Sequence, residues 1–247
     1  MLYHFDLNLL LSFPVRESED RKAFLIGALI ILASFIIPII PILLVTGYVM
    51  RIMRQVLAGE SPRMVAWDDW EKMLVDGTRL FGARLVYMLP VLLVFLVALG
   101  ILLIAPLLLE GGEERVVQVI FLMTMLPSFM MVLLMPVMLV LSVFLPAAEL
   151  HLVARNEFAA AFRVREWWAI FRANWGGFLL ALAITYAISI LTSMLLQIAM
   201  ITMVLICALP VLLPAMSMYL MLVSEVAFAQ AYKEGTLRLE SGIMQAP

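Results

Sequence analysis

Five long apolar stretches constrain this sequence more than any other feature. They cover residues 23–50, 85–109, 116–148, 177–200 and 211–232. A helix of about 20 apolar residues spans the roughly 30 Å hydrocarbon core of a bilayer, and every stretch is long enough to do so. The chain is 65% hydrophobic and 14% charged, whereas a soluble domain is about half apolar and about a quarter charged. Because lipid must cover so much apolar surface, the sequence predicts an all-α, multi-pass protein of the cell (cytoplasmic) membrane, with residues 1–247 as a single membrane domain.

The first apolar stretch, residues 23–50, leaves two alternatives open. Pro38 and Pro41 interrupt it, so it forms either one kinked, tilted span or a helical hairpin that turns near these prolines. The hairpin returns the basic residues between Arg16 and Lys22 to the cytoplasm, which the positive-inside rule favours. We therefore expect four full spans plus an N-terminal hairpin or kinked span broken by proline.

The remaining segments are assigned by the same pattern of apolar and charged residues. We expect an interfacial segment over 1–22, an interfacial loop over 51–84, a helical pair over 85–148, an interfacial helix over 149–176, a second helical pair over 177–232 and a flexible cytoplasmic tail over 233–247. Within residues 116–148, three prolines are expected to break the helix: Pro127, Pro136 and Pro146.

Each of the two stretches between spans is basic and carries tryptophan, and we expect each to form a cytoplasmic amphipathic helix. In the first, Gly59 is the expected C-cap of the preceding helix, and Asp68 or Asp69 is the expected N-cap of the next. In the second, Asn156 is the expected N-cap. The expected apolar stripes are Trp70, Met73, Leu74 and Leu80 in the first helix, and Phe158, Phe162, Trp168, Phe171 and Trp175 in the second.

The first stretch, GYVMRIMRQVLAGESPRMVAWDDWEKMLVDG, resembles the hallmark of the DUF4013 family of bacterial and archaeal membrane proteins. The matching residues are Gly47, Tyr48, Arg51, Arg54, Gly59, Glu60, Trp67, Asp68, Asp69, Trp70, Asp76 and Gly77. The second half, with AAFRVREWW, an apolar hairpin and AQAYKEG, is also similar to that family. The resemblance covers nearly the whole chain. It implies a fold and a location, but no activity, because the family has no agreed one.

Residues that catalytic and metal sites require are sparse. The chain has two histidines, His4 and His151, and one cysteine, Cys207, which are too few for a histidine-based metal site or a nucleophilic triad. It also lacks a glycine-rich phosphate loop and a run of Lys and Arg suited to nucleic acid. We therefore expect no enzymatic activity, no metal, no cofactor and no nucleic-acid partner.

Candidate binding residues lie in the two basic stretches. They are Arg51, Arg54, Trp67, Trp70, Arg163, Arg165, Trp168 and Arg172. All five tryptophans fall in these stretches, although simple anchoring places aromatic residues at both membrane interfaces. We hypothesise that the two helices form one cytoplasmic collar that binds anionic lipid, a membrane-protein partner or a second copy. The alternative is ordinary anchoring combined with the positive-inside signal.

Polar residues inside the apolar stretches are the second set of candidates. Glu225 lies in the last stretch and Gln197 in the one before it. An ionisable residue at membrane depth suggests a functional site, although it can also be hydrogen-bonded between helices. The sequence thus favours a non-catalytic accessory or assembly subunit that engages lipid or a partner on the cytoplasmic side. The alternative is a small transporter or channel that uses polar residues around Glu225 and the fourth apolar stretch.

Overall fold

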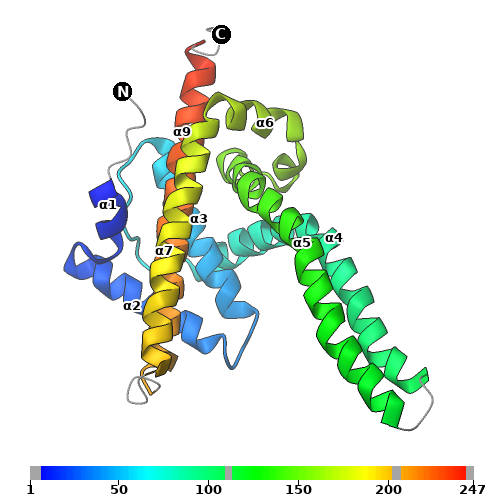
Figure 1. Cartoon of the computed structure of the whole chain (residues 1–247). Coiled ribbons are helices and arrows are strands. Elements are labelled where there is room, and N and C mark those ends of the chain that lie inside the picture. Colours follow the sequence, from blue (N-terminus) through cyan, green and yellow to red (C-terminus); the bar gives the residue numbers. More distant parts are fainter. Residues whose placement is uncertain (1–6, 109–112, 202–206, 243–247) are drawn as a thin grey trace. The chain divides into compact units, whose positions relative to one another are not determined.

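A computed structural model describes residues 7–108, 113–201 and 207–242 of the chain, and these residues contain helices, turns and loops but no strand. The helices are α1 (Leu7–Ser12), η1 (Phe13–Val15), α2 (Ser18–Ala33), α3 (Ile40–Ala58), α4 (Trp70–Leu108), α5 (Glu113–Arg155), η2 (Phe158–Phe162), α6 (Val164–Ala173), α7 (Trp175–Ile201) and α9 (Leu209–Glu240) (Figure 1). The all-helical fold expected from the apolar stretches is therefore present.

Five of the described helices are long and apolar enough to cross a membrane: α3, α4, α5, α7 and α9. The first of them, α3, is the second half of the proline-interrupted stretch. Its other half, α2, has only 16 residues and is about 24 Å long at 1.5 Å per residue. Almost none of the residues in the apolar windows of α4, α5 and α7 is buried within the protein, which suits contact with lipid hydrocarbon.

The chain forms two compact units, one of Met1–Ala83 with Pro146–Pro247 and the other of Arg84–Leu145. The second unit consists of the C-terminal part of α4 and the N-terminal part of α5. The first holds the buried core, and its central helix is α9, which contacts α1, α2, α3, α6 and α7. The polar groups considered below all belong to the first unit.

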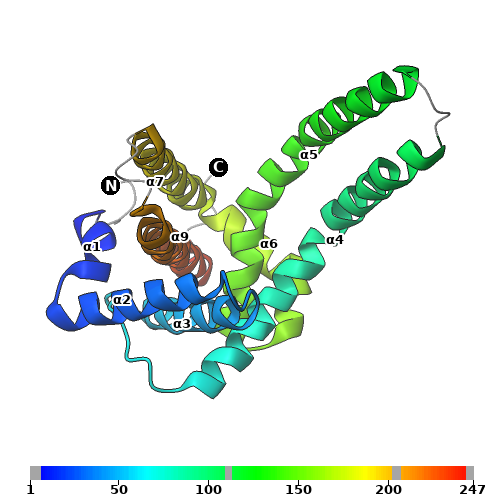
Figure 2. The ribbon, with the colours of Figure 1, turned by 90° about the horizontal axis from the view of Figure 1, so that it is seen from below.

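The stretch 23–50 forms two helices rather than one. The chain turns over residues 34–39, where the N–H groups of Ile36 and Ile37 donate to the carbonyl of Ala33 at 3.0 and 2.9 Å. Pro38 has no N–H to continue the helix. Helices α2 and α3 then lie side by side (Figure 2). This is the geometry of the hairpin alternative; where the hairpin lies in a membrane stays a prediction.

Three local expectations were wrong. Helix α5 runs unbroken through its prolines to Arg155, because a helix in an apolar environment has no water to replace its other backbone bonds. Asn156 is not an N-cap: it follows α5 with a φ of 54°, a left-handed conformation that asparagine tolerates. The segment expected as a flexible tail continues α9 to Glu240, because Gly235 packs closely against the carbonyl oxygen of Ile170 in α6.

The expected interfacial helix over 149–176 is divided among several elements. Its first residues form the end of α5, where residues 149–153 are buried. Its middle forms η2, and only Val164–Ala173 form the separate helix α6. Likewise, the helix expected after Asp69 is not separate, since α4 runs without interruption from Trp70 to Leu108. The C-cap at Gly59 is confirmed, with a φ of 96°.

Candidate functional site

Helices α3 and α4 cross at two glycines. A methyl group at Gly47 would lie 1.8 Å from the carbonyl oxygen of Met73, and one at Gly77 would lie 1.9 Å from that of Leu43. No side chain fits at either distance, so the two backbones touch directly. This crossing positions the end of α3 and the start of α4 beside each other.

An aromatic pair fixes the loop between these helices. The rings of Tyr48 and Trp67 stack with centroids 3.9 Å apart and planes 6° apart. The Tyr48 hydroxyl donates to the carbonyl of Val65 at 2.8 Å and accepts from its N–H at 3.0 Å. The Trp67 indole donates to the carbonyl of Ala23 in α2 at 2.9 Å. Trp67 thus joins α2, α3 and the loop.

The two arginines of α3 are also engaged within the protein. Arg51 donates to Asp68 at 2.7 Å, and this hydrogen bond holds the pKa of the Asp68 carboxyl below its ordinary value. Arg54 donates to the buried Asp76 and, at 3.0 Å, to the side-chain oxygen of Asn156. The other aspartate of the pair, Asp69, accepts from the N–H of Lys72 at 3.2 Å and so caps α4. Most of the polar and aromatic hallmark residues therefore contact other residues of the hallmark stretch.

Helix α6 has two distinct faces. Trp167, Ile170 and Phe171 are buried, and α6 packs against α9, so its apolar face is covered by protein. The opposite face carries Arg165, Trp168 and Arg172, spaced three and four residues apart and all exposed. We call these three residues the α6 outer stripe. Within the described part of the chain neither arginine of the stripe has an ion-pair partner, whereas Arg163 pairs with Glu157 at 2.7 Å.

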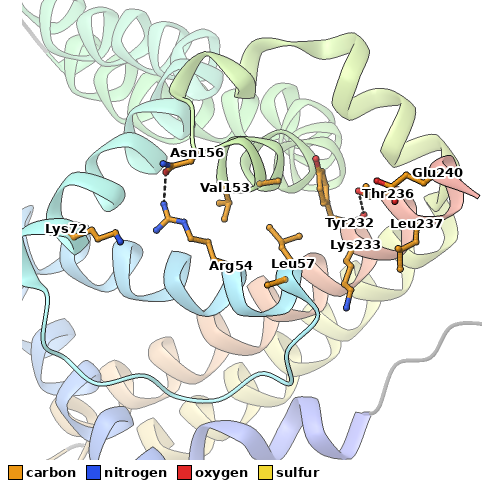
Figure 3. Close-up of a pocket in the computed structure, with 12 residues that line it drawn as sticks. Arg54, Leu57, Lys72, Val153, Asn156, Tyr232, Lys233, Thr236, Leu237 and Glu240 are labelled. Atoms are coloured by element: carbon orange, nitrogen blue, oxygen red, sulfur yellow. Dashed lines mark hydrogen bonds between the residues drawn. The ribbon is translucent and has the colours of Figure 1, made fainter.

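A pocket of about 810 Å³ opens where α3, α4, α5 and α9 end or begin. Arg54, Lys72 and Asn156 lie on one side of it, and Tyr232, Thr236 and Glu240 on the other, with Leu57 and Val153 between them (Figure 3). Lys233 and Leu237 complete the α9 side. The polar groups on its wall include three cations, an amide, two hydroxyls and one carboxylate, and we call it the helix-end pocket.

A buried histidine contacts Tyr232, one of the residues that line this pocket. One ring nitrogen of His151, Nδ1, lies 2.6 Å from the hydroxyl of Tyr232, and the other, Nε2, lies 3.0 Å from a carboxylate oxygen of Glu166. His151 is almost completely buried, while Glu166 is half-exposed on α6. If Glu166 is ionised it only accepts, so the neutral imidazole donates through Nε2 and accepts from Tyr232 through Nδ1.

No local pattern in the sequence predicts this chain of three groups. Their only sequence signal is a histidine at the end of an apolar stretch, because the partners are 15 and 81 residues away. In the part of the chain that the structure describes, no group of three or more His, Cys, Asp or Glu residues could hold a metal ion.

The structure brings only some of the predicted site residues together. Arg54 donates a hydrogen bond to Asn156 and so contacts the second basic stretch. Trp70 is exposed at the start of α4, whereas the α6 outer stripe lies on α6. Glu225 is half-buried within α9, and Gln197 is exposed close to the end of α7. Neither of them lines the helix-end pocket.

A family model described as "Protein of unknown function (DUF4013)" matches residues 30–201 of the chain. This range contains all the hallmark residues, the end of α5 and the whole of α6 and α7. No curated protein and no solved structure matches the chain.

Proposed function

The chain belongs to the DUF4013 family, and we propose that it is a non-catalytic, multi-pass accessory or assembly subunit of the cytoplasmic membrane that holds anionic lipid through the α6 outer stripe. The single observation that carries this proposal is the two-faced α6 helix. Trp167, Ile170 and Phe171 are buried on one face. On the other face Trp168 stacks on Phe171 but stays 39% exposed, and Arg165 and Arg172 have no ion-pair partner among the described residues.

The chemistry of the stripe suits a membrane surface. Trp168 is 39% exposed, and indole rings favour the headgroup level. Arginine can extend its charged end to phosphate groups while its stem stays on apolar surface. Each arginine near an anionic surface contributes about 1 kcal/mol of attraction. Two arginines and one tryptophan together therefore favour peripheral retention of anionic lipid over neutral lipid.

The test compares two double variants with the same change in charge. Arg165→Gln with Arg172→Gln removes the unpaired arginines, whereas Arg155→Gln with Arg163→Gln removes two arginines that already have carboxylate partners at 3.9 and 2.7 Å. Anionic lipid that copurifies from native membranes is quantified by mass spectrometry. We expect a loss of anionic lipid from the first variant only.

Equal lipid content in the two correctly inserted variants would overturn the lipid proposal. Loss of a stoichiometric protein from the stripe variant, with unchanged lipid, would mean that the stripe docks a membrane-protein partner or a second copy instead. Both outcomes are read from the same preparation.

The alternative is a small transporter or channel, and the half-buried carboxylate of Glu225 within a candidate span motivates it. It predicts that Glu225→Gln abolishes a proton- or cation-linked flux in liposomes, while Lys22→Gln, at an exposed site on α2, does not. An absence of flux through the wild-type protein would remove this alternative.

A further inference from the structure

We infer that the helix-end pocket binds a phosphate ester, with Lys72 as the residue that recognises the phosphate. This site is separate from the α6 outer stripe and does not depend on the function proposed for it. The pocket is within the range of about 300–1,000 Å³ that is usual for small-ligand sites. Its lining residues come from four helices and from Asn156, which follows α5, and all belong to one compact unit.

The three cations of the pocket differ in what else they do. Arg54 is held by Asp76 and Asn156. The ammonium group of Lys233 lies beside the C-cap of α3, 3.1 Å from where a side chain at Gly59 would begin, and a helix C-terminus favours a positive charge there. Both cations therefore have a structural role in the folded chain.

Lys72 has no such role. It lies in the first turn of α4, where the positive end of the helix dipole disfavours a cation. Within the described residues its ammonium group has no ion-pair partner. Lys72 also lines a second, smaller pocket together with the acidic residues Asp69, Glu71 and Asp76. In Figure 3 its ammonium group points toward Arg54. A phosphate group bound between two such cations would stabilise this arrangement, because it accepts hydrogen bonds from both.

The rest of the pocket indicates what the phosphate is attached to. Asn156 accepts from Arg54 through its side-chain oxygen, so its amide N–H groups remain as donors beside Lys72. Leu57 and Val153 form an apolar middle, and the carboxylate of Glu240 lies at the far side with Thr236 (Figure 3). A carboxylate only accepts hydrogen bonds. The pocket therefore fits an ester with phosphate at one end and hydroxyl groups at the other, such as a glycerol phosphate unit.

This ligand chemistry has two sources, an anionic lipid headgroup and a free phosphate ester. The purified full chain is titrated calorimetrically with glycerol 3-phosphate in detergent. It is also reconstituted into nanodiscs of phosphatidylcholine with and without phosphatidylglycerol, and lipid enrichment around the protein is measured. Binding in the first experiment identifies a soluble ester, and enrichment in the second alone identifies a headgroup.

Lys72→Gln is the decisive variant, Lys72→Arg the conservative one and Lys22→Gln the matched control. Lys22 is an exposed lysine of α2 that pairs with Glu19 at 2.7 Å, outside the pocket. We expect Lys72→Gln to weaken binding about tenfold, the usual effect of losing one charge-assisted hydrogen bond. Lys72→Arg should retain most of the affinity, and Lys22→Gln should match the wild type.

Thermal unfolding of the same variants separates binding from structure. Because Lys72 opposes the α4 dipole, its replacement by glutamine should leave the unfolding temperature unchanged or raise it. Weaker binding with equal or higher stability supports the inference. Affinity within twofold of the wild type in Lys72→Gln overturns it, and so does a wild-type protein that binds neither glycerol 3-phosphate nor phosphatidylglycerol.

Discussion

Arg51 and Arg54 lie about one turn apart on α3, yet their aspartate partners differ in burial. The side chain of Asp68 is 63% exposed, whereas that of Asp76 is 4% exposed. Water screens the first ion pair strongly, so it contributes little to stability. The second pair has lost most of its hydration on the carboxylate side, so removing either partner leaves a poorly hydrated group without its main counter-charge.

We predict that Asp76→Asn destabilises the protein by about 3 kcal/mol, because it leaves Arg54 partly buried without its carboxylate. Asp68→Asn makes the same change in charge at an exposed pair and should have only a slight effect. Unfolding of both variants in detergent with rising denaturant gives the comparison. Equal destabilisation by the two changes would contradict the argument from burial.

A second prediction concerns the pH dependence of the Arg51–Asp68 pair. Because Arg51 lowers the pKa of Asp68 in the folded chain, the unfolded state binds the proton more readily. The pair's contribution is fully present above the ordinary aspartate pKa of about 3.9 and is lost as the pH falls through the lower folded value. The stability difference between wild type and Asp68→Asn should therefore shrink in strong acid. A difference that grows with acidity would contradict this sign.

At the scale of elements, the crossing of α3 and α4 shows how a helix pair can depend on two residues. Direct backbone contact at Gly47 and Gly77 leaves no space for a methyl group. The same two glycines begin and end the hallmark stretch. Between them, Tyr48, Trp67 and the two arginine–aspartate pairs hold the intervening loop. The hallmark therefore describes one local structural unit rather than a set of reactive groups.

We predict that Gly47→Ala costs about 3 kcal/mol, because the added methyl group forces the two backbones apart. Gly100→Ala is the matched control: Gly100 lies within α4, and nothing lies within 4 Å of a methyl group there. That change should stabilise the helix by up to about 1 kcal/mol, the ordinary preference of a helix for alanine. Similar losses of stability in both variants would mean that the crossing is looser than described.

At the scale of the whole molecule, the ends of α3, α5 and α9 and the start of α4 meet around one pocket. Chain segments that meet in this way must lie on the same side of any membrane that the helices cross. We therefore expect the start of α2, both tryptophan-bearing stretches and the C-terminal end of α9 to share one side, and basic residues assign that side to the cytoplasm.

Cysteine labelling from outside the cell tests this topology on a Cys207→Ala background. A cysteine at Gly112, which lies outside the described residues, should react with a membrane-impermeant reagent, because the sequence assigns residues 110–115 to the external side. A cysteine at Ser18, the first residue of α2, should react only after the membrane is permeabilised. External labelling at Ser18 would place the start of α2 outside and contradict the hairpin orientation.

Local signals in the sequence predicted the helical class, the five apolar stretches and the C-cap at Gly59, because hydropathy and backbone preference act over a few residues. They failed at Asn156, which suits both an N-cap and a left-handed residue, and the continuation of α5 decided between the two. They could not show that α9 covers the apolar face of α6, since an amphipathic stripe is the same whether lipid or protein buries it. Partners as distant as Arg54 with Asn156 and His151 with Tyr232 met only through helix packing. The helix-end pocket therefore depends on the tertiary structure, because contacts across 81 and 102 residues leave no periodic pattern in the chain.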